Sequence, residues 1–143
     1  MARIQIDLPG KFVFTTEIPV RVTDLNYGGH VGNDSVLSIM HEARVQFYRS
    51  LGFKDEITIE GNIGQIMADV AIVYKSQSFL GDVMVIQIGA KDFNKYGFDL
   101  VYLITNKASG KEIARGKTGI VCFDYSVRKI ALVPALLTDR LNA

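Results

Sequence analysis

The chain has 143 residues, of which 48% are hydrophobic and 22% charged, and its formal net charge is +1. This composition predicts a single domain over residues 1–143 with one hydrophobic core. A nearly neutral chain without a block of Lys and Arg is not typical of a nucleic-acid-binding surface. The N-terminus does not resemble a signal peptide, and no apolar run approaches about 18 residues, so we expect a soluble cytoplasmic protein without a membrane partner.

The first half of the chain predicts one strand followed by one long helix. Residues 11–23 are rich in Phe, Val, Thr and Ile, and Pro19 indicates a sheet edge or a bulge. In residues 34–50 the apolar positions cover more than one helical stripe, which predicts a mostly buried helix. Gly52 is placed to end this helix, and residues 53–64 form a connecting segment.

The second half of the chain is dominated by alternating apolar and polar residues. Four such runs predict strands, and the short turns between them favour hairpins between antiparallel neighbours. A short helix is expected over residues 134–141, with Pro134 in its first turn. This order of elements indicates an α+β fold in which a curved antiparallel β-sheet wraps around one long central helix. The predicted strands are residues 65–76, 82–91, 98–106 and 111–125.

The turn between the first strand and the helix is rich in polar residues and glycine. Glycine permits unusual backbone angles and the close approach of a ligand, and short polar side chains supply hydrogen bonds. A reactive or ligand-binding site is therefore predicted where the turn meets the helix. Its candidate residues are Asp24, Asn26, Gly28, Gly29, His30, Gly32, Asn33 and Asp34.

Three short motifs carry a resemblance to a known family. They are Asp-Leu-Asn-x-x-Gly-His-Val-x-Asn from Asp24, the helical Glu42-Ala43-Arg44, and Phe79-Leu80-Gly81-Asp82. With the spacing between them, they resemble the hotdog-fold acyl-CoA thioesterases, in the 4-hydroxybenzoyl-CoA thioesterase-like branch. The resemblance covers the chain from Phe12 to about Pro134.

The resemblance implies a homodimer whose two sheets join edge to edge, often paired again into a homotetramer, with active sites between subunits. Such enzymes hydrolyse the thioester of acyl-CoA or acyl-carrier protein without a metal or an organic cofactor. Their oxyanion donors are backbone N–H groups at the start of the central helix, here near Asn33. The acyl chain is expected to pass Val36 and Met40, and Lys and Arg side chains in residues 115–129 are expected to contact CoA phosphates.

The sequence departs from the family at the catalytic carboxylate, because Asn26 stands where the family has its second Asp. An amide cannot accept a proton at neutral pH and is a poor nucleophile. Asn26 could hold water or the carbonyl while Asp34 or Glu42 acts as the base. It could instead work together with His30, or the site could bind an acyl thioester with little or no hydrolysis. A non-catalytic binding or assembly dimer is therefore the alternative to a thioesterase.

Each candidate also has a structural interpretation. Asp24 is expected to fix the turn by accepting backbone N–H bonds, and Asp34 or Ser35 to cap the helix. His30 could satisfy backbone groups at the helix entry. Glu42 is expected to pair with a basic side chain such as Arg44 or Arg49, because a carboxylate on so apolar a helix is costly to bury alone. Glycines 28, 29 and 32 could serve the backbone alone.

Two residues outside the turn are assigned no catalytic role. Cys122 lies in the last predicted strand, where packing is favoured over a role as nucleophile. A hotdog hydratase is disfavoured because His41, alone on the helix, lacks the pattern of those enzymes.

Overall fold

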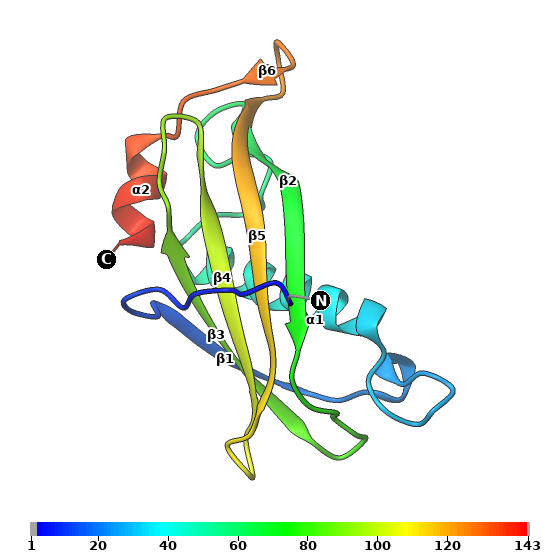
Figure 1. Cartoon of the computed structure of the whole chain (residues 1–143). Coiled ribbons are helices and arrows are strands. Elements are labelled where there is room, and N and C mark those ends of the chain that lie inside the picture. Colours follow the sequence, from blue (N-terminus) through cyan, green and yellow to red (C-terminus); the bar gives the residue numbers. More distant parts are fainter. Residues whose placement is uncertain (1–2, 143) are drawn as a thin grey trace.

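The computed structural model describes residues 3–142 (Figure 1). Six strands in this range form one antiparallel sheet in the order β1-β3-β4-β5-β2, and the short β6 pairs with β5. Sheet and helix therefore combine in the predicted α+β arrangement. The strands are β1 (Phe14–Pro19), β2 (Ile63–Tyr74), β3 (Val83–Lys91), β4 (Gly97–Asn106), β5 (Glu112–Asp124) and β6 (Lys129–Ile130).

The long helix α1 (Asn33–Ser50) lies across one face of the curved sheet, and the N-terminal segment crosses the opposite face (Figure 1). A short 3-10 helix, η1 (Val22–Asp24), leads into the turn before α1. The C-terminal helix α2 (Ala135–Leu141) agrees with the helix predicted over residues 134–141. The start of α1 lies beside β2, at one edge of the sheet, where the Tyr74 hydroxyl donates to Asn33 O (Figure 1).

Helix α1 packs closely against the sheet through one face. Ile39 and Met40 are fully buried, and a Cβ placed on Gly116 of β5 would lie 2.4 Å from Met40 Cε. The opposite face is open, with Leu37 41% exposed. The prediction of a mostly buried helix was wrong for the protomer, because the apolar residues beyond the first stripe do not face the sheet.

The four later strands agree with the sequence prediction to within two residues, but the first strand and one connection differ. The predicted strand 11–23 is shortened to β1, because the chain turns into η1 after Pro19. The predicted hairpin between β2 and β3 was wrong: β2 pairs with β5 at one edge, while β3 pairs with β4 and with β1 at the other. Residues 75–82 therefore carry the chain from one edge toward the other.

The ends of α1 are set by glycine rather than by polar caps. Gly32 occupies the N-cap position, so the prediction that Asp34 or Ser35 caps the helix was wrong. The predicted role of Gly52 is confirmed: its φ is 91°, its N–H donates to Arg49 O, and Phe53 N–H donates to Tyr48 O. This pair of bonds is a Schellman motif, which fixes where the helix stops.

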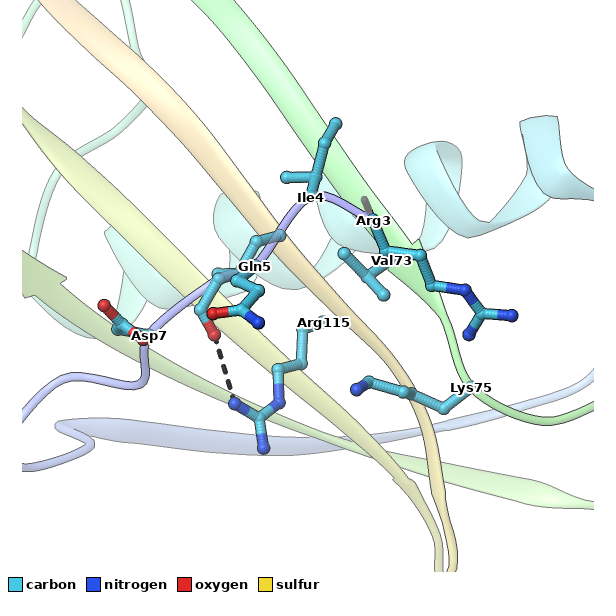
Figure 2. A pocket seen from close by; sticks show the side chains of 8 residues that line it. Arg3, Ile4, Gln5, Asp7, Val73, Lys75 and Arg115 are labelled. Atoms are coloured by element: carbon cyan, nitrogen blue, oxygen red, sulfur yellow. Dashed lines mark hydrogen bonds between the residues drawn. The ribbon is translucent and has the colours of Figure 1, made fainter. Parts of the chain in front are cut away.

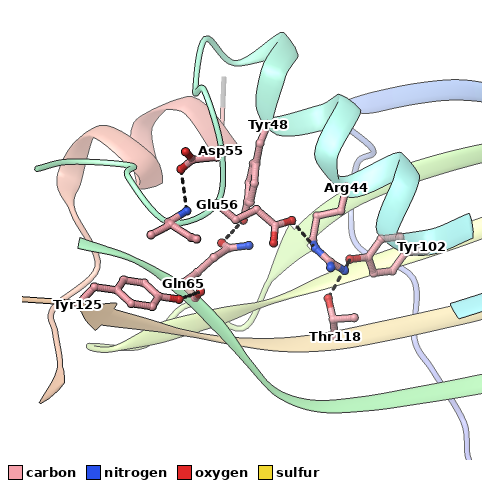
Figure 3. Close-up of polar contacts among 9 residues, drawn as sticks. Arg44, Tyr48, Asp55, Glu56, Gln65, Tyr102, Thr118 and Tyr125 are labelled. Atoms are coloured by element: carbon pink, nitrogen blue, oxygen red, sulfur yellow. Dashed lines mark hydrogen bonds and ion pairs between the residues drawn. The ribbon is translucent and has the colours of Figure 1, made fainter. Parts of the chain in front are cut away.

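A buried polar network ties the middle of α1 to the sheet (Figure 3). Arg44 donates from Nε to Glu56 Oε1 at 2.8 Å and from Nη1 to the Tyr102 hydroxyl at 3.2 Å. The Tyr102 hydroxyl also bonds Thr118 Oγ1 at 2.9 Å. Burial alone would lower the pKa of Arg44, but Tyr102 and Glu56 raise it. The guanidinium therefore stays charged inside the protomer, and Glu42 is not its partner there.

Cys122 is fully buried in β5, and burial raises its pKa to about 11. A thiol with so high a pKa carries little thiolate at neutral pH. The packing role predicted from the sequence is confirmed.

Replacing Arg44 with Leu is expected to lower the free energy of unfolding by about 3 kcal/mol, because the Glu56 carboxylate and the Tyr102 hydroxyl lose a buried partner. Urea denaturation measures the change. Lys107→Ala, which breaks an exposed pair with Glu17, is the control and should cost less than about 0.5 kcal/mol. Equal losses in the two variants would contradict a structural role for the buried pair.

Candidate functional site

The turn before α1 is closed by its own backbone. Asn26 N–H donates to His30 O at 2.8 Å, and Gly29 N–H donates to Asn26 O at 3.0 Å. Gly29 has φ of 82°, a conformation that favours glycine, so its predicted backbone role is confirmed. The turn is therefore a fixed loop that projects Asn26 to Gly28 beyond the end of the helix.

Two neighbouring segments hold this loop in place. Val31 N–H donates to Ser78 O at 2.8 Å, and the His30 backbone bridges Phe79. The His30 and Phe79 rings also meet edge to face, with centroids 6.5 Å apart. On the other side, Gly32 N–H donates to Asp24 O at 3.0 Å. Residues 75–82, the crossing segment, therefore hold the turn in place through backbone and ring contacts.

Asp24 is a structural residue, as its bonds show. Its carboxylate accepts from Arg21 N–H at 2.8 Å and from the Arg21 guanidinium at 3.0 and 3.2 Å. Burial would raise the pKa of Asp24, which is 3% exposed, but the hydrogen bonds and charge of Arg21 outweigh it and lower the pKa. The predicted role of Asp24 in fixing the turn is confirmed.

The Asn26 side chain is oriented by backbone donors. Its Oδ1 accepts from Gly28 N–H at 2.9 Å and, more weakly, from His30 N–H at 3.4 Å. A Cβ placed on Gly28 would lie 3.2 Å from Asn26 Oδ1 and 3.5 Å from His30 Nε2, so the absence of a side chain at Gly28 leaves room for both groups. The Asn26 Nδ2 group has no partner within residues 3–142, which leaves two N–H bonds free for a ligand.

The first residues of α1 complete the cluster. A Cβ placed on Gly32 would lie 2.7 Å from Asp34 Oδ1 and 3.5 Å from Asn26 Cβ, so the Asp34 carboxylate and the base of the Asn26 side chain both lie beside Gly32. Asp34 N–H is taken by Asn33 Oδ1 at 3.0 Å, whereas Asn33 N–H has no acceptor within the described residues. A free N–H at the positive end of a helix favours a negatively charged ligand atom.

Tyr74 is a site residue that the sequence analysis missed. Its hydroxyl donates to Asn33 O at 3.0 Å, and burial, followed by the negative charge of Asp34, raises its pKa. A hollow of about 310 Å³ opens here, lined by His30, Asn33, Tyr74 and Lys75 among others. An alternating strand pattern places Tyr74 on a face of β2 but gives no sign that this face meets the helix start.

Three predicted site residues lie outside this cluster. Val36 and Met40 are buried residues of α1, at 3% and 0% exposure, and their predicted contact with an acyl chain stays a prediction. Glu42 is exposed, about 13 Å along the helix from Asn33. It accepts from Gln46 Nε2 at 2.8 Å. Within one protomer the turn therefore gathers Asn26, His30 and Asp34, but not Glu42.

No group of three or more His, Cys, Asp or Glu side chains in residues 3–142 is arranged to hold a metal ion. That the activity needs no metal or cofactor stays a prediction. Neither helix in the same range has the length and apolar character needed to cross a membrane.

Comparison with known proteins identifies the family of this chain. The family model of the thioesterase-like superfamily matches residues 20–141, which is most of the chain and includes the whole turn. The chain belongs to this superfamily. At the level of the family, the prediction of a thioester hydrolase is confirmed.

Individual relatives of the superfamily match over nearly their full length. The chain is 25% identical over 127 residues to the long-chain acyl-CoA thioesterase FadM of Escherichia coli (strain K12), covering 89% of this chain and 96% of that protein. A 1,4-dihydroxy-2-naphthoyl-CoA thioesterase from Synechocystis superposes with a TM-score of 0.82 at 23% identity, over 90% of this chain and 95% of that one. A Thermus thermophilus thioesterase complexed with coenzyme A and Zn superposes with a TM-score of 0.76 at 23% identity, over 93% of this chain and 100% of that one. The predicted hotdog fold is confirmed.

The Asp24 carboxylate should make the stability of this thioesterase domain dependent on pH. Its pKa is lowered in the folded state, so its contribution is present above the unfolded value of about 3.9 and is lost as pH falls through the folded value. Asp24→Asn is expected to lower the free energy of unfolding by about 1.5 kcal/mol at neutral pH, with a smaller difference below about pH 4. Denaturation across pH measures this, with the exposed Asp139→Asn as the control. A difference that did not change with pH would contradict the assignment.

Proposed function

We propose that the protein is an acyl-CoA thioesterase that hydrolyses a fatty acyl-CoA to the free acid and CoA. The observation that carries this proposal is the cluster at the start of α1, where Asn26 and Asp34 flank Gly32 beside a free backbone N–H. The likeness to FadM, a long-chain acyl-CoA thioesterase, supports a fatty acyl group, and the Synechocystis neighbour keeps an aromatic acyl group as the next candidate. Location in the cytoplasm stays a prediction.

In this proposal two donors stabilise the thioester oxygen as negative charge develops on it. The first is Asn33 N–H at the positive end of α1. The second is Asn26 Nδ2, which is turned outward because Oδ1 is held by the backbone of Gly28. An asparagine at this position therefore supplies a donor, which an ionised aspartate could not.

Asp34 takes the role of general base in this mechanism. Its carboxylate accepts a proton from water, and the oxygen of that water forms a bond to the thioester carbonyl carbon. When the tetrahedral intermediate collapses, the carbon–sulfur bond breaks, and the CoA sulfur leaves with the electron pair and takes the proton from Asp34. His30 acts as a positioning residue, because its backbone N–H helps to orient the Asn26 amide.

The proposal includes a homodimer formed through β2. This strand of 12 residues ends the sheet, and no strand among residues 3–142 covers its outer edge. A long apolar edge strand is a template for pairing with another chain. Its exposed apolar side chains are Ile66, Met67, Val70 and Tyr74.

The second candidate function is a hotdog dimer that binds an acyl thioester without hydrolysing it. Asn26 is the observation that favours it, because the residue cannot act as the catalytic carboxylate. The two functions differ in a simple measurement, since only the thioesterase releases CoA with turnover.

Thiol release from a panel of acyl-CoAs, acetyl to palmitoyl with benzoyl added, tests the proposal. The wild type is expected to turn over with a preference for long chains. Asp34→Asn should lower kcat by at least roughly a hundredfold with little change in KM, because it removes the base. Asp139→Asn, which removes an exposed carboxylate on α2, is the matched control. Loss of activity in Glu42→Gln with full activity in Asp34→Asn would move the base to Glu42.

Gly32→Ala should separate catalytic geometry from folding. Gly32 has φ of −72°, which alanine adopts without strain. The added methyl carbon would lie only 2.7 Å from Asp34 Oδ1, so the Asp34 carboxylate would have to move. We expect kcat to fall roughly tenfold to a hundredfold while the melting temperature changes little. Gly10→Ala, where a Cβ meets nothing within 4 Å, is the control. Full activity in Gly32→Ala would contradict a catalytic role for the Asp34 position.

A further inference from the structure

The position of the Asp34 carboxylate depends on the backbone that carries it. Neither carboxylate oxygen makes a hydrogen bond or an ion pair within residues 3–142. Gly32, the N-cap before it, offers no side-chain bond to the start of α1. A general base needs a fixed distance to its water, and a displacement of about 1 Å can lower a rate about a hundredfold. The first turn of α1 must therefore be held by contacts elsewhere.

Tyr74 supplies such a contact from the sheet. Its hydroxyl donates to Asn33 O at 3.0 Å. Within residues 3–142, this is the only hydrogen bond that joins residues 33–36 to a residue outside α1 and its N-cap. Asn33 O and the Asp34 nitrogen belong to one planar peptide unit, and the nitrogen end of that unit donates to Asn33 Oδ1 at 3.0 Å. The peptide plane directly before Asp34 is therefore held at both ends.

The backbone at the end of β2 is fixed by the neighbouring strand. Tyr74 lies opposite Ala114 of β5 in the antiparallel register. The next two N–H groups, of Lys75 and Ser76, both donate to Ile113 O, at 2.8 and 3.1 Å. The Tyr74 hydroxyl is therefore carried by a part of the sheet that is hydrogen-bonded up to and beyond this residue.

The N-terminal segment crosses the other face of the sheet at the end of β2 (Figure 2). Arg115 of β5 donates from Nη1 to Ile6 O at 3.1 Å, which fastens this segment to the sheet. Val73 lies beside it and lines a hollow of about 280 Å³ together with residues 3–7. Successive strand residues point to opposite faces, so Tyr74 faces α1 while Val73 faces the N-terminal segment. Contacts on both faces therefore restrain the end of β2.

The Tyr74 hydroxyl stays protonated at neutral pH. Burial, followed by the negative charge of Asp34, raises the pKa of Tyr74 above its ordinary value of about 10. The hydroxyl is therefore a hydrogen-bond donor throughout the pH range in which the proposed hydrolysis would be measured. A phenol that keeps its proton and donates it to Asn33 O cannot act as the base, so any part in the reaction is indirect.

We propose that Tyr74 is a positioning residue, which holds the Asp34 carboxylate in place through the Asn33 carbonyl. This inference rests on the proposed thioesterase function, in which Asp34 is the base. The geometry of the site is then set by β2 as well as by the turn before α1, because the strand and the turn meet at the first residue of the helix.

Tyr74→Phe removes the hydroxyl and keeps the ring on the proposed dimer edge. It is expected to lower kcat for a long-chain acyl-CoA roughly threefold to tenfold, with KM within about twofold, because one hydrogen bond that fixes the base is lost. Tyr96→Phe is the matched control: Tyr96 is 43% exposed against 47% for Tyr74, and its hydroxyl has no partner within the described residues. An equal kcat in the wild type and Tyr74→Phe, or an equal loss in both variants, would overturn the proposal.

The link between Tyr74 and Asp34 is tested by combining variants. If Tyr74 acts through Asp34, Tyr74→Phe should cause no further loss of kcat in a chain that already carries Asp34→Asn. The residual thiol release of Asp34→Asn is therefore measured with and without the second change. The same fold loss in both backgrounds would overturn the proposal, because Tyr74 would then act on the fold and not on the base.

A failure of the proposed hydrolysis can be told apart from a failure of this anchor. Backbone order parameters from NMR relaxation report the mobility of the first turn of α1 whether or not the protein is active. Tyr74→Phe should lower them for residues 33–36 and leave the middle of α1 unchanged, whereas Tyr96→Phe should leave both unchanged. If the wild type releases no thiol, this pattern would still support the anchor, and unchanged order parameters in Tyr74→Phe would overturn it.

Discussion

The site depends on how the turn before α1 is fastened to the rest of the protomer. Val31 bonds Ser78 in the crossing segment, and Gly32 bonds Asp24, which is itself held by Arg21. These hydrogen bonds fix both the direction of α1 and the position of Asn26. Because residues 75–82 run from one sheet edge toward the other, the strand order that separates β2 from β3 also supplies the support of the site.

Asn26 stands where the family has a carboxylate, and this replacement changes which residue can accept a proton and which can donate a hydrogen bond. The amide oxygen accepts from the backbone of the turn, so in the proposed mechanism Asn26 offers its N–H donors to the substrate. Negative charge is present instead on Asp34, in the first turn of α1, where the helix dipole favours it. In the proposed mechanism, donor and base are therefore divided between Asn26 and Asp34, and the missing side chain of Gly32 leaves room for both.

Local sequence patterns predicted the elements well because helix and strand periodicities are local. The turn was found from its density of polar residues and glycine, and the structural role of Asp24 from the chemistry of Asx turns. Strand pairing could not be predicted from local pattern in the same way. The short turn at residues 79–82 indicated a hairpin between β2 and β3, but β3 pairs with β1 on one side and β4 on the other, so β2 cannot pair with it.

Contacts between distant segments account for the other errors and omissions. Tyr74 reaches Asn33 across 41 positions, and Arg44 reaches Tyr102 across 58, so neither contact leaves a trace in local spacing. The N-cap was misassigned because Asp34 is a good capping residue by type, whereas the N-cap is Gly32, two residues earlier, and the helix begins at Asn33.

The most direct test of a catalytic Asn26 is thiol release from a long-chain acyl-CoA by the wild type and Asn26→Asp, measured side by side. The expected result is turnover by the wild type and a lower kcat in Asn26→Asp, because an ionised carboxylate at this position removes the donor and adds negative charge beside Asp34. A silent wild type with an active Asn26→Asp would contradict it, and would show that the chain binds acyl thioesters at a site that lacks its catalytic carboxylate.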